Sequence, residues 1–118
     1  MGKYSLAYGQ LAAALTFEQL RLIFCAMQVQ LRESSHYTGG EYLVLRDAND
    51  SRITFEKVAF NEYLLRGEAA TDAELLGIVQ QASAALTAAQ VQHSIELYDA
   101  QDALFGYLHY QWPAAPLT

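Results

Sequence analysis

Three histidines are the residues of this 118-residue chain best suited to metal binding or acid–base chemistry. His93 lies on the same face of an expected strand as Val91 and Ile95, which favours a buried, hydrogen-bonded histidine over a metal ligand. His93 and His109 fall on neighbouring expected strands as candidate cross-strand neighbours, but no Cys and no helical His or Glu with ligand spacing joins them. We therefore expect neither a metal site nor a cofactor.

The segment that begins at Asp47 resembles the start of a calcium-binding loop, because Asp47, Asn49 and Ser51 supply oxygen ligands at alternate positions. Arg52 stands where such a loop requires glycine, and Val58 stands where it requires a bidentate glutamate. The pattern therefore fails as a calcium site.

Nucleophilic catalysis has two candidates, Cys25 and the triplet Ser34-Ser35-His36. Cys25 falls among apolar residues in an expected helix, which indicates a packed and unreactive thiol. The triplet lies in an expected loop, where adjacent residues need not face one another. Carboxylates in the expected turns are solvated by default. We therefore expect a protein that is not an enzyme.

The elements that would position these residues are two helices and two hairpins. Thr16 and Gln19 have the spacing of a capping box, and apolar residues at three- and four-residue steps extend the first helix to about Glu33. Thr71 opens a second helix in the same way. The expected strands are 41–47 and 52–58, then 91–99 and 104–112. Residues 59–67 fit either a short helix or an extended segment.

An internal repeat links the two hairpins. Asp47-Ala48-Asn49-Asp50 matches Asp99-Ala100-Gln101-Asp102. We therefore predict a single α+β domain over 1–118, with one helix-hairpin unit at 16–58 and a second at 71–112. In tandem, these units predict a four-stranded antiparallel sheet with helices packed on one face.

The last expected strand, 104–112, carries apolar or aromatic residues on both faces, unlike a sheet with one face in solvent. Either the N-terminal segment 4–15 covers its outer face, or that face meets a partner.

Composition excludes several classes of protein. Hydrophobic residues make up 53% and charged residues 17%, which is typical of a globular chain. The net charge of −6 argues against binding to nucleic acid or to an anionic membrane. The most apolar window, 11–31, holds too many polar residues to span a bilayer, and the N-terminus lacks a secretory pattern. With one cysteine, these features predict a cytoplasmic protein.

Charge is divided unequally along the chain. Residues 1–66 hold seven basic and seven acidic residues, whereas residues 67–118 contain no Lys or Arg and carry the whole net charge. A surface of one sign speeds encounter with an oppositely charged partner. Tyrosine and tryptophan, which are enriched at binding hot spots, are also frequent in the acidic half. Both features favour a binding surface there for a protein with a basic surface.

A short, acidic α+β chain with a tyrosine-rich acidic half resembles the bacterial immunity proteins that neutralise polymorphic or contact-delivered toxins. The resemblance covers size, charge and element order and includes no diagnostic motif. It implies a non-enzymatic inhibitor that binds a cognate toxin. The expected contact residues are Glu96, Tyr98, Asp99, Asp102, Tyr107 and Trp112.

Two alternatives stay open. Secretion chaperones of class I are also small, acidic α+β proteins and are typically homodimers, although they usually end in a helix where this chain ends in a strand and a Pro-containing tail. A small enzyme or ligand-binding domain would instead need a pocket near His93 or His109.

Overall fold

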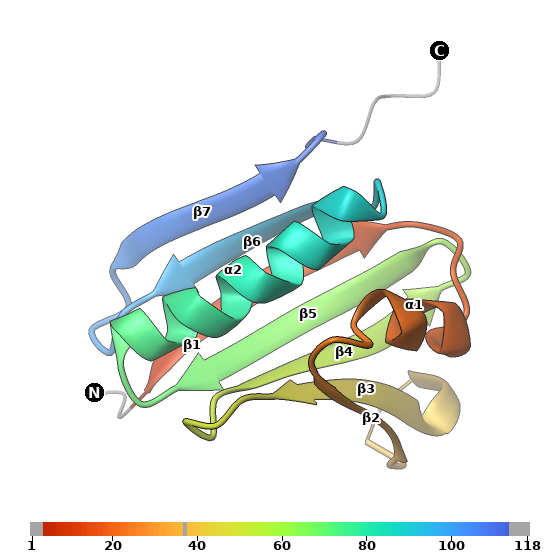
Figure 1. The fold of residues 1–118 in the computed structure, drawn as a ribbon, viewed down its shortest axis with the longest axis horizontal. Coiled ribbons are helices and arrows are strands. Elements are labelled where there is room, and N and C mark those ends of the chain that lie inside the picture. Colours follow the sequence, from red (N-terminus) through yellow and green to blue (C-terminus); the bar gives the residue numbers. More distant parts are fainter. Residues whose placement is uncertain (1–3, 37, 114–118) are drawn as a thin grey trace.

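The computed structural model describes residues 4–36 and 38–113. Within these ranges the chain forms one antiparallel sheet of seven strands, and both helices pack on the same face of it (Figure 1). The strands are β1 (Ser5–Ala12), β2 (Gln28–Glu33), β3 (Glu41–Arg46), β4 (Arg52–Ala59), β5 (Glu62–Ala69), β6 (Gln92–Tyr98) and β7 (Leu104–Tyr110). The helices are α1 (Phe17–Ile23) and α2 (Asp72–Ala88), with a short 3-10 turn at Thr38–Gly40.

The predicted four-stranded sheet of two tandem helix-hairpin units is wrong. The strand order is β2-β3-β4-β5-β1-β6-β7, so the sheet contains three strands besides the two expected hairpins. β5 and β1 lie between the hairpins, and β2 lies at the outer edge. The hairpins also attach differently. The first hairpin joins the middle of the sheet through its second strand, β4, which neighbours β5. The second hairpin joins it through its first strand, β6, which neighbours β1. The two hairpins therefore do not pair with each other, because β5 and β1 lie between them.

The first helix is much shorter than predicted. Its capping box is present, since the Thr16 N–H donates to Gln19 Oε1 at 2.9 Å and the Gln19 N–H donates to Thr16 Oγ1 at 3.1 Å. The predicted continuation beyond Ile23 is wrong, because Gln28–Glu33 is the edge strand β2. This segment alternates polar and apolar residues from Gln28 to Leu31, a pattern that also suits a strand, and it pairs with β3 along its whole length.

The N-terminal segment is an inner strand of the sheet. β1 pairs antiparallel with β5 on one side and with β6 on the other. It therefore does not cover the last strand, as one of the two explanations from the sequence supposed. β7 instead packs one face against α2 and leaves the other face open. The ambiguous segment 59–67 ends β4 and supplies most of β5.

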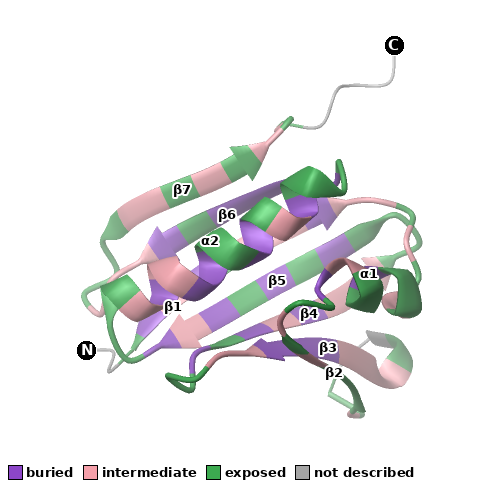
Figure 2. Cartoon of the chain, in the orientation of Figure 1, coloured by how far each residue is buried: buried purple, intermediate pink, exposed green. Residues whose placement is uncertain are grey.

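The core lies between the sheet and the helices. Along β5, buried residues alternate with exposed or partly exposed ones, and the buried set faces the helices (Figure 2). Phe24, directly after α1, stacks on Phe55 of β4 with ring centroids 5.2 Å apart. α2 begins at its predicted cap, where Thr71 Oγ1 accepts from the Glu74 N–H at 3.1 Å. Its buried residues are Leu75, Ile78, Val79, Ala82, Ser83 and Leu86.

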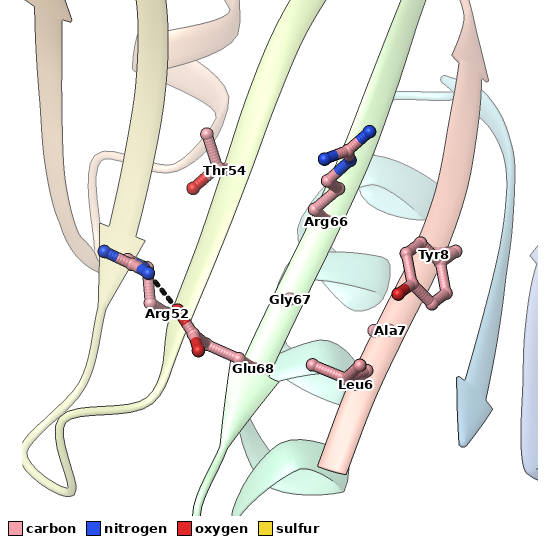
Figure 3. Close-up of a pocket in the computed structure, with 8 residues that line it drawn as sticks. All are labelled: Leu6, Ala7, Tyr8, Arg52, Thr54, Arg66, Gly67 and Glu68. Carbon is pink, nitrogen blue, oxygen red and sulfur yellow. Dashed lines mark hydrogen bonds and ion pairs between the residues drawn. The ribbon is translucent and has the colours of Figure 1, made fainter. Parts of the chain in front are cut away.

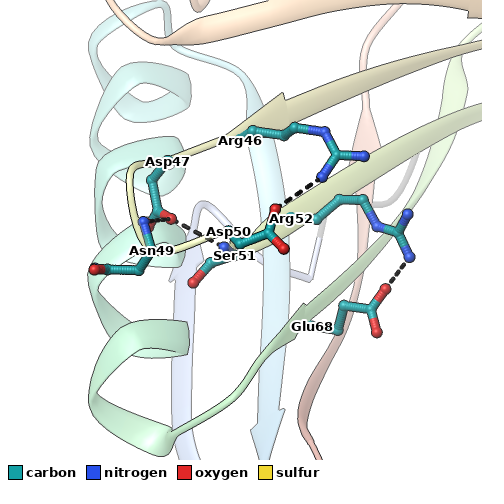
Figure 4. Close-up of polar contacts among 7 residues, drawn as sticks. All are labelled: Arg46, Asp47, Asn49, Asp50, Ser51, Arg52 and Glu68. Atoms are coloured by element: carbon teal, nitrogen blue, oxygen red, sulfur yellow. Dashed lines mark hydrogen bonds and ion pairs between the residues drawn. The ribbon is translucent and has the colours of Figure 1, made fainter.

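The repeat found in the sequence is real in the two hairpin turns. Asp47 Oδ1 accepts from the N–H groups of Asn49 and Ser51 at 2.9 and 3.0 Å (Figure 4). In the β6–β7 turn, Asp99 Oδ1 accepts from the corresponding N–H groups, both at 2.9 Å. Asp50 and Asp102 both have φ of 64°, a conformation that Asp tolerates better than most residues. The repeat therefore encodes a shared turn.

Tyr63 of β5 holds the linker between β1 and α1, residues 13–16, against the sheet through a hydrogen bond. This buried side chain donates its hydroxyl hydrogen to the Leu15 carbonyl. Lys57 Nζ donates to the same carbonyl at 2.9 Å and lies 5.6 Å from the centre of the Tyr63 ring. Phe17 packs edge-on against that ring, with centroids 5.5 Å apart. Burial raises the pKa of Tyr63 to about 12.

Tyr63→Phe is expected to lower the free energy of unfolding by about 1 kcal/mol at neutral pH, because one buried hydrogen bond is lost while Lys57 still serves the carbonyl. The wild type should also lose stability as the pH rises from about 10, the ordinary tyrosine value, to about 12, since the unfolded chain ionises first. Urea unfolding at pH 8 measures the first effect. Urea unfolding between about pH 10 and about pH 12 measures the second. The control Tyr4→Phe changes an exposed tyrosine and keeps Tyr63, so it should lose stability at alkaline pH as the wild type does. An equal alkaline loss of stability in Tyr63→Phe would contradict the assignment of this loss to Tyr63.

Candidate protein-binding face

The face of the sheet opposite the helices lies open, and we call it the uncovered face. The register assigns residues to it, because directly paired residues of antiparallel strands point to the same side. Its aromatic and arginine side chains are Tyr8, Tyr42, Tyr98, Tyr107, Arg32, Arg46, Arg52 and Arg66. Tyr8 and Tyr107 are 46% and 48% exposed. The face thus presents large amphipathic side chains to solvent.

One cross-strand row runs through the centre of this face. Tyr8 of β1 pairs directly with Arg66 of β5 and with Glu96 of β6, and Glu96 pairs with Tyr107 of β7. Tyr98 meets Tyr8 edge-on, with ring centroids 6.0 Å apart. The Tyr8 ring therefore stands between a cation and an anion that belong to different strands.

A hollow of about 300 Å³ lies on the arginine side of Tyr8. Leu6, Thr54, Arg52, Arg66 and Glu68 line it together with Tyr8 (Figure 3). Arg52 is engaged in an ion pair with Glu68, its direct cross-strand neighbour. Arg66 extends away from that pair and makes no ion pair or hydrogen bond with any residue in 4–36 or 38–113. Its guanidinium is therefore available to an anion.

A second hollow, of about 340 Å³, lies on the other side of Tyr8. Its lining includes Gln10, Ser94, Glu96, Tyr107 and Trp112. The Glu96 carboxylate accepts from the Tyr98 hydroxyl at 2.9 Å, and this hydrogen bond raises the pKa of Tyr98. Tyr107 also stacks on His109, with ring centroids 5.0 Å apart. This hollow joins one carboxylate to several aromatic rings.

Four of the six predicted contact residues lie together on the uncovered face. Glu96, Tyr98 and Tyr107 are placed there by the register, and Trp112 lines the second hollow. Asp99 and Asp102 lie in the β6–β7 turn at the edge of the face. The Asp99 carboxylate accepts hydrogen bonds from two backbone N–H groups of that turn.

Sequence reasoning missed Tyr8, Arg52 and Arg66. These side chains come from the half of the chain that is neutral overall, so the uncovered face carries both signs of charge. For Arg66 the signal was present in the alternation of Leu65, Gly67 and Ala69 with Arg66 and Glu68, which marks a strand with one buried face.

Acidic residues gather at one end of the sheet. β3, β5 and β6 run in the same direction, so the segments that follow them emerge at the same end (Figure 1). The acidic residues of these segments are Asp47, Asp50, Asp72, Glu74, Asp99 and Asp102. Asp47 and Asp99 accept hydrogen bonds from backbone N–H groups of their own turns. Arg46 pairs with Asp50 at 3.4 Å, and Ser5 Oγ donates to Asp72. This acidic end adjoins the uncovered face.

His93 and His109 are not neighbours on one face. His93 pairs with Tyr110 and His109 with Ser94, so the two imidazoles lie on opposite sides of the sheet. His93 is fully buried, as predicted, with Nδ1 at 2.8 Å from the Val91 carbonyl and Nε2 at 2.7 Å from Ser83 Oγ. Since a carbonyl only accepts, Nδ1 donates and Nε2 of the neutral ring accepts from Ser83. Both nitrogens are therefore committed to structure.

The other candidates for chemistry are separate from this histidine. Cys25, predicted as a packed helical thiol, is exposed in the turn after α1. Within residues 4–36 and 38–113, no group of three or more His, Cys, Asp or Glu side chains is placed to hold a metal ion. The described helices are also too short or too polar to cross a membrane.

Comparison with protein-family models finds no family that matches this chain, and comparison with curated proteins finds no similar sequence. The geometry of the uncovered face is therefore the basis for a proposed function.

Proposed function

We propose that this chain is a non-enzymatic protein-binding inhibitor, an immunity protein that neutralises a cognate bacterial toxin, and that it meets its partner with the uncovered face. The observation that carries the proposal is the exposure of Tyr8, Tyr107 and Arg66 in one row of an open sheet. Tyrosine, tryptophan and arginine are enriched among the few residues that contribute most of the binding free energy at protein interfaces. An open sheet also holds such side chains on a rigid backbone, which reduces the entropy lost on binding.

The acidic end supports a partner with a basic surface. The chain has a net charge of −6, and the acidic turns lie beside the uncovered face. Such a field attracts a basic protein over several ångströms and raises its association rate, most strongly at low ionic strength. The final contact would then form on the mixed charges and aromatic rings of the face.

Calorimetry tests this proposal with the C-terminal domain of the protein encoded immediately upstream, at low and at high ionic strength. We expect a one-to-one complex that weakens with salt. Tyr107→Ala should weaken it roughly 30-fold, as expected for a hot-spot aromatic residue. Gln81→Ala, an exposed change on α2 at the opposite side of the molecule, is the control and should leave the affinity unchanged. Absence of binding, or binding that Tyr107→Ala leaves intact, would overturn the proposal.

The second candidate, a homodimeric secretion chaperone, is favoured by one observation. β7 is an edge strand, and it contains no Asp, Glu, Lys or Arg to prevent pairing with another strand. Two copies joined along β7 would form a continuous sheet. Sedimentation equilibrium separates the candidates, because a monomeric mass in solution excludes the homodimer.

A further inference from the structure

We infer that the uncovered face recognises its protein partner through two hollows of opposite charge, one that takes an acidic side chain at Arg66 and one that takes a basic side chain at Glu96. This inference rests on the proposed function and specifies the chemistry of the partner.

The first hollow suits a carboxylate. Arg66 has no partner within the described residues, whereas its neighbour Arg52 is already paired with Glu68. The Thr54 and Tyr8 side chains lie on the strands to either side of Arg66, and both residues line the same hollow. A guanidinium binds a carboxylate through two parallel hydrogen bonds, and a neighbouring hydroxyl can donate a third.

The second hollow suits a guanidinium or an ammonium group. Glu96 is exposed and supplies the negative charge. Tyr107 and Trp112 line the same hollow, and the faces of such rings attract cations. Ser94 and Gln10, which pair with each other across β6 and β1, also line this hollow and add hydrogen-bonding groups. A basic side chain would thus meet a carboxylate and aromatic rings together.

Tyr8 keeps the two charges apart. Arg66 and Glu96 lie on the strands that flank β1, so their backbones are separated by about 10 Å, twice the usual strand spacing. The Tyr8 ring stands between them and packs against Tyr98. No ion pair joins Arg66 to Glu96 in the structure. Neither charge is therefore neutralised by the other, and only one oxygen of the Glu96 carboxylate, Oε1, accepts from Tyr98. A partner with its basic side chain at Arg66 and its acidic side chain at Glu96 would meet like charges.

Titration of the isotope-labelled full chain with two capped amino acids, followed by backbone and indole NMR signals, tests the inference without any partner. N-acetyl-arginine amide should shift the signals of Glu96, Tyr107 and the Trp112 indole. N-acetyl-glutamic acid α-amide should shift those of Thr54 and Arg66. Glu96→Gln should weaken only the cationic probe, by about tenfold, and Arg66→Gln only the anionic probe, by a similar factor.

The matched controls lie on the same face outside both hollows. Glu62→Gln and Arg32→Gln remove the same types of charge from exposed positions and should leave both titrations unchanged. The inference is overturned if neither probe gives saturable shifts, or if the control variants weaken the probes as much as the hollow variants do. Because the toxin plays no part in this titration, its failure is distinct from failure of the proposed function.

Discussion

Gly9→Ala is expected to lower the free energy of unfolding by about 3 kcal/mol, because the new methyl group would force β1 and β6 apart. A Cβ at this position would lie 2.4 Å from the Ser94 carbonyl oxygen and 3.1 Å from Ile95 Cγ1. The carbonyl belongs to the backbone of the neighbouring strand and cannot rotate away as a flexible side chain would. The clash is therefore relieved only by moving a strand in the middle of the sheet.

Two other glycines provide controls for this change. At Gly77, in the interior of α2, a Cβ would meet no atom within 4 Å, so Gly77→Ala should stabilise the protein by about 1 kcal/mol through the higher helix propensity of alanine. At Gly106 the nearest atom is Leu97 Cδ1 at 3.1 Å, the end of a flexible side chain, and the cost should be small. Urea unfolding of the three variants measures these differences. Wild-type stability in Gly9→Ala would contradict the pairing of β1 with β6.

His93→Ala is expected to be the second severe change, with a loss of about 3–4 kcal/mol. The substitution opens a cavity beneath α2 and removes the imidazole, which leaves the Val91 carbonyl and the Ser83 hydroxyl without their shared partner. A buried carbonyl without a partner costs more than an exposed one, because water cannot replace the lost donor. Thermal and urea unfolding measure the loss.

His93 should also make stability depend on pH. Burial lowers the pKa of His93, because the protein interior disfavours the charged imidazolium. The unfolded chain therefore binds the proton first. Stability should be complete above about pH 6.5, the ordinary histidine value, and should decline as the pH falls from there through the lowered pKa.

The matched variants are His93→Gln and His109→Gln. His93→Gln should flatten the decline in acid, although the protein is less stable throughout. His109→Gln, at an exposed position on the other face, should keep most of the decline. Equal acid slopes in both variants and the wild type would remove His93 as the source.

Features determined by neighbouring residues were predictable from the sequence. The caps at Thr16 and Thr71 and the repeated turns at Asp47 and Asp99 depend on hydrogen bonds that span two to four residues, and all four are present. The buried state of His93 followed from strand alternation.

Strand partners were not predictable in the same way. Gln28–Glu33 reads acceptably as helix or strand, and its pairing with β3 decides between them. β1 and β5 depend on each other across about half of the chain, and neither carries a turn signal that identifies its partner. The missed strands hid Tyr8 and Arg66, so the basic side of the candidate face was missed with them.

The position of β1 in the sheet also determines when this strand can pair during synthesis of the chain. The ribosome releases β1 first, but its two neighbours are residues 62–69 and 92–98. Until β6 emerges, one edge of β1 has no partner, and pairing over such sequence distances is slow. A nascent chain halted before residue 92 would therefore hold a sheet with an exposed inner strand, the kind of intermediate that chaperones shield from aggregation.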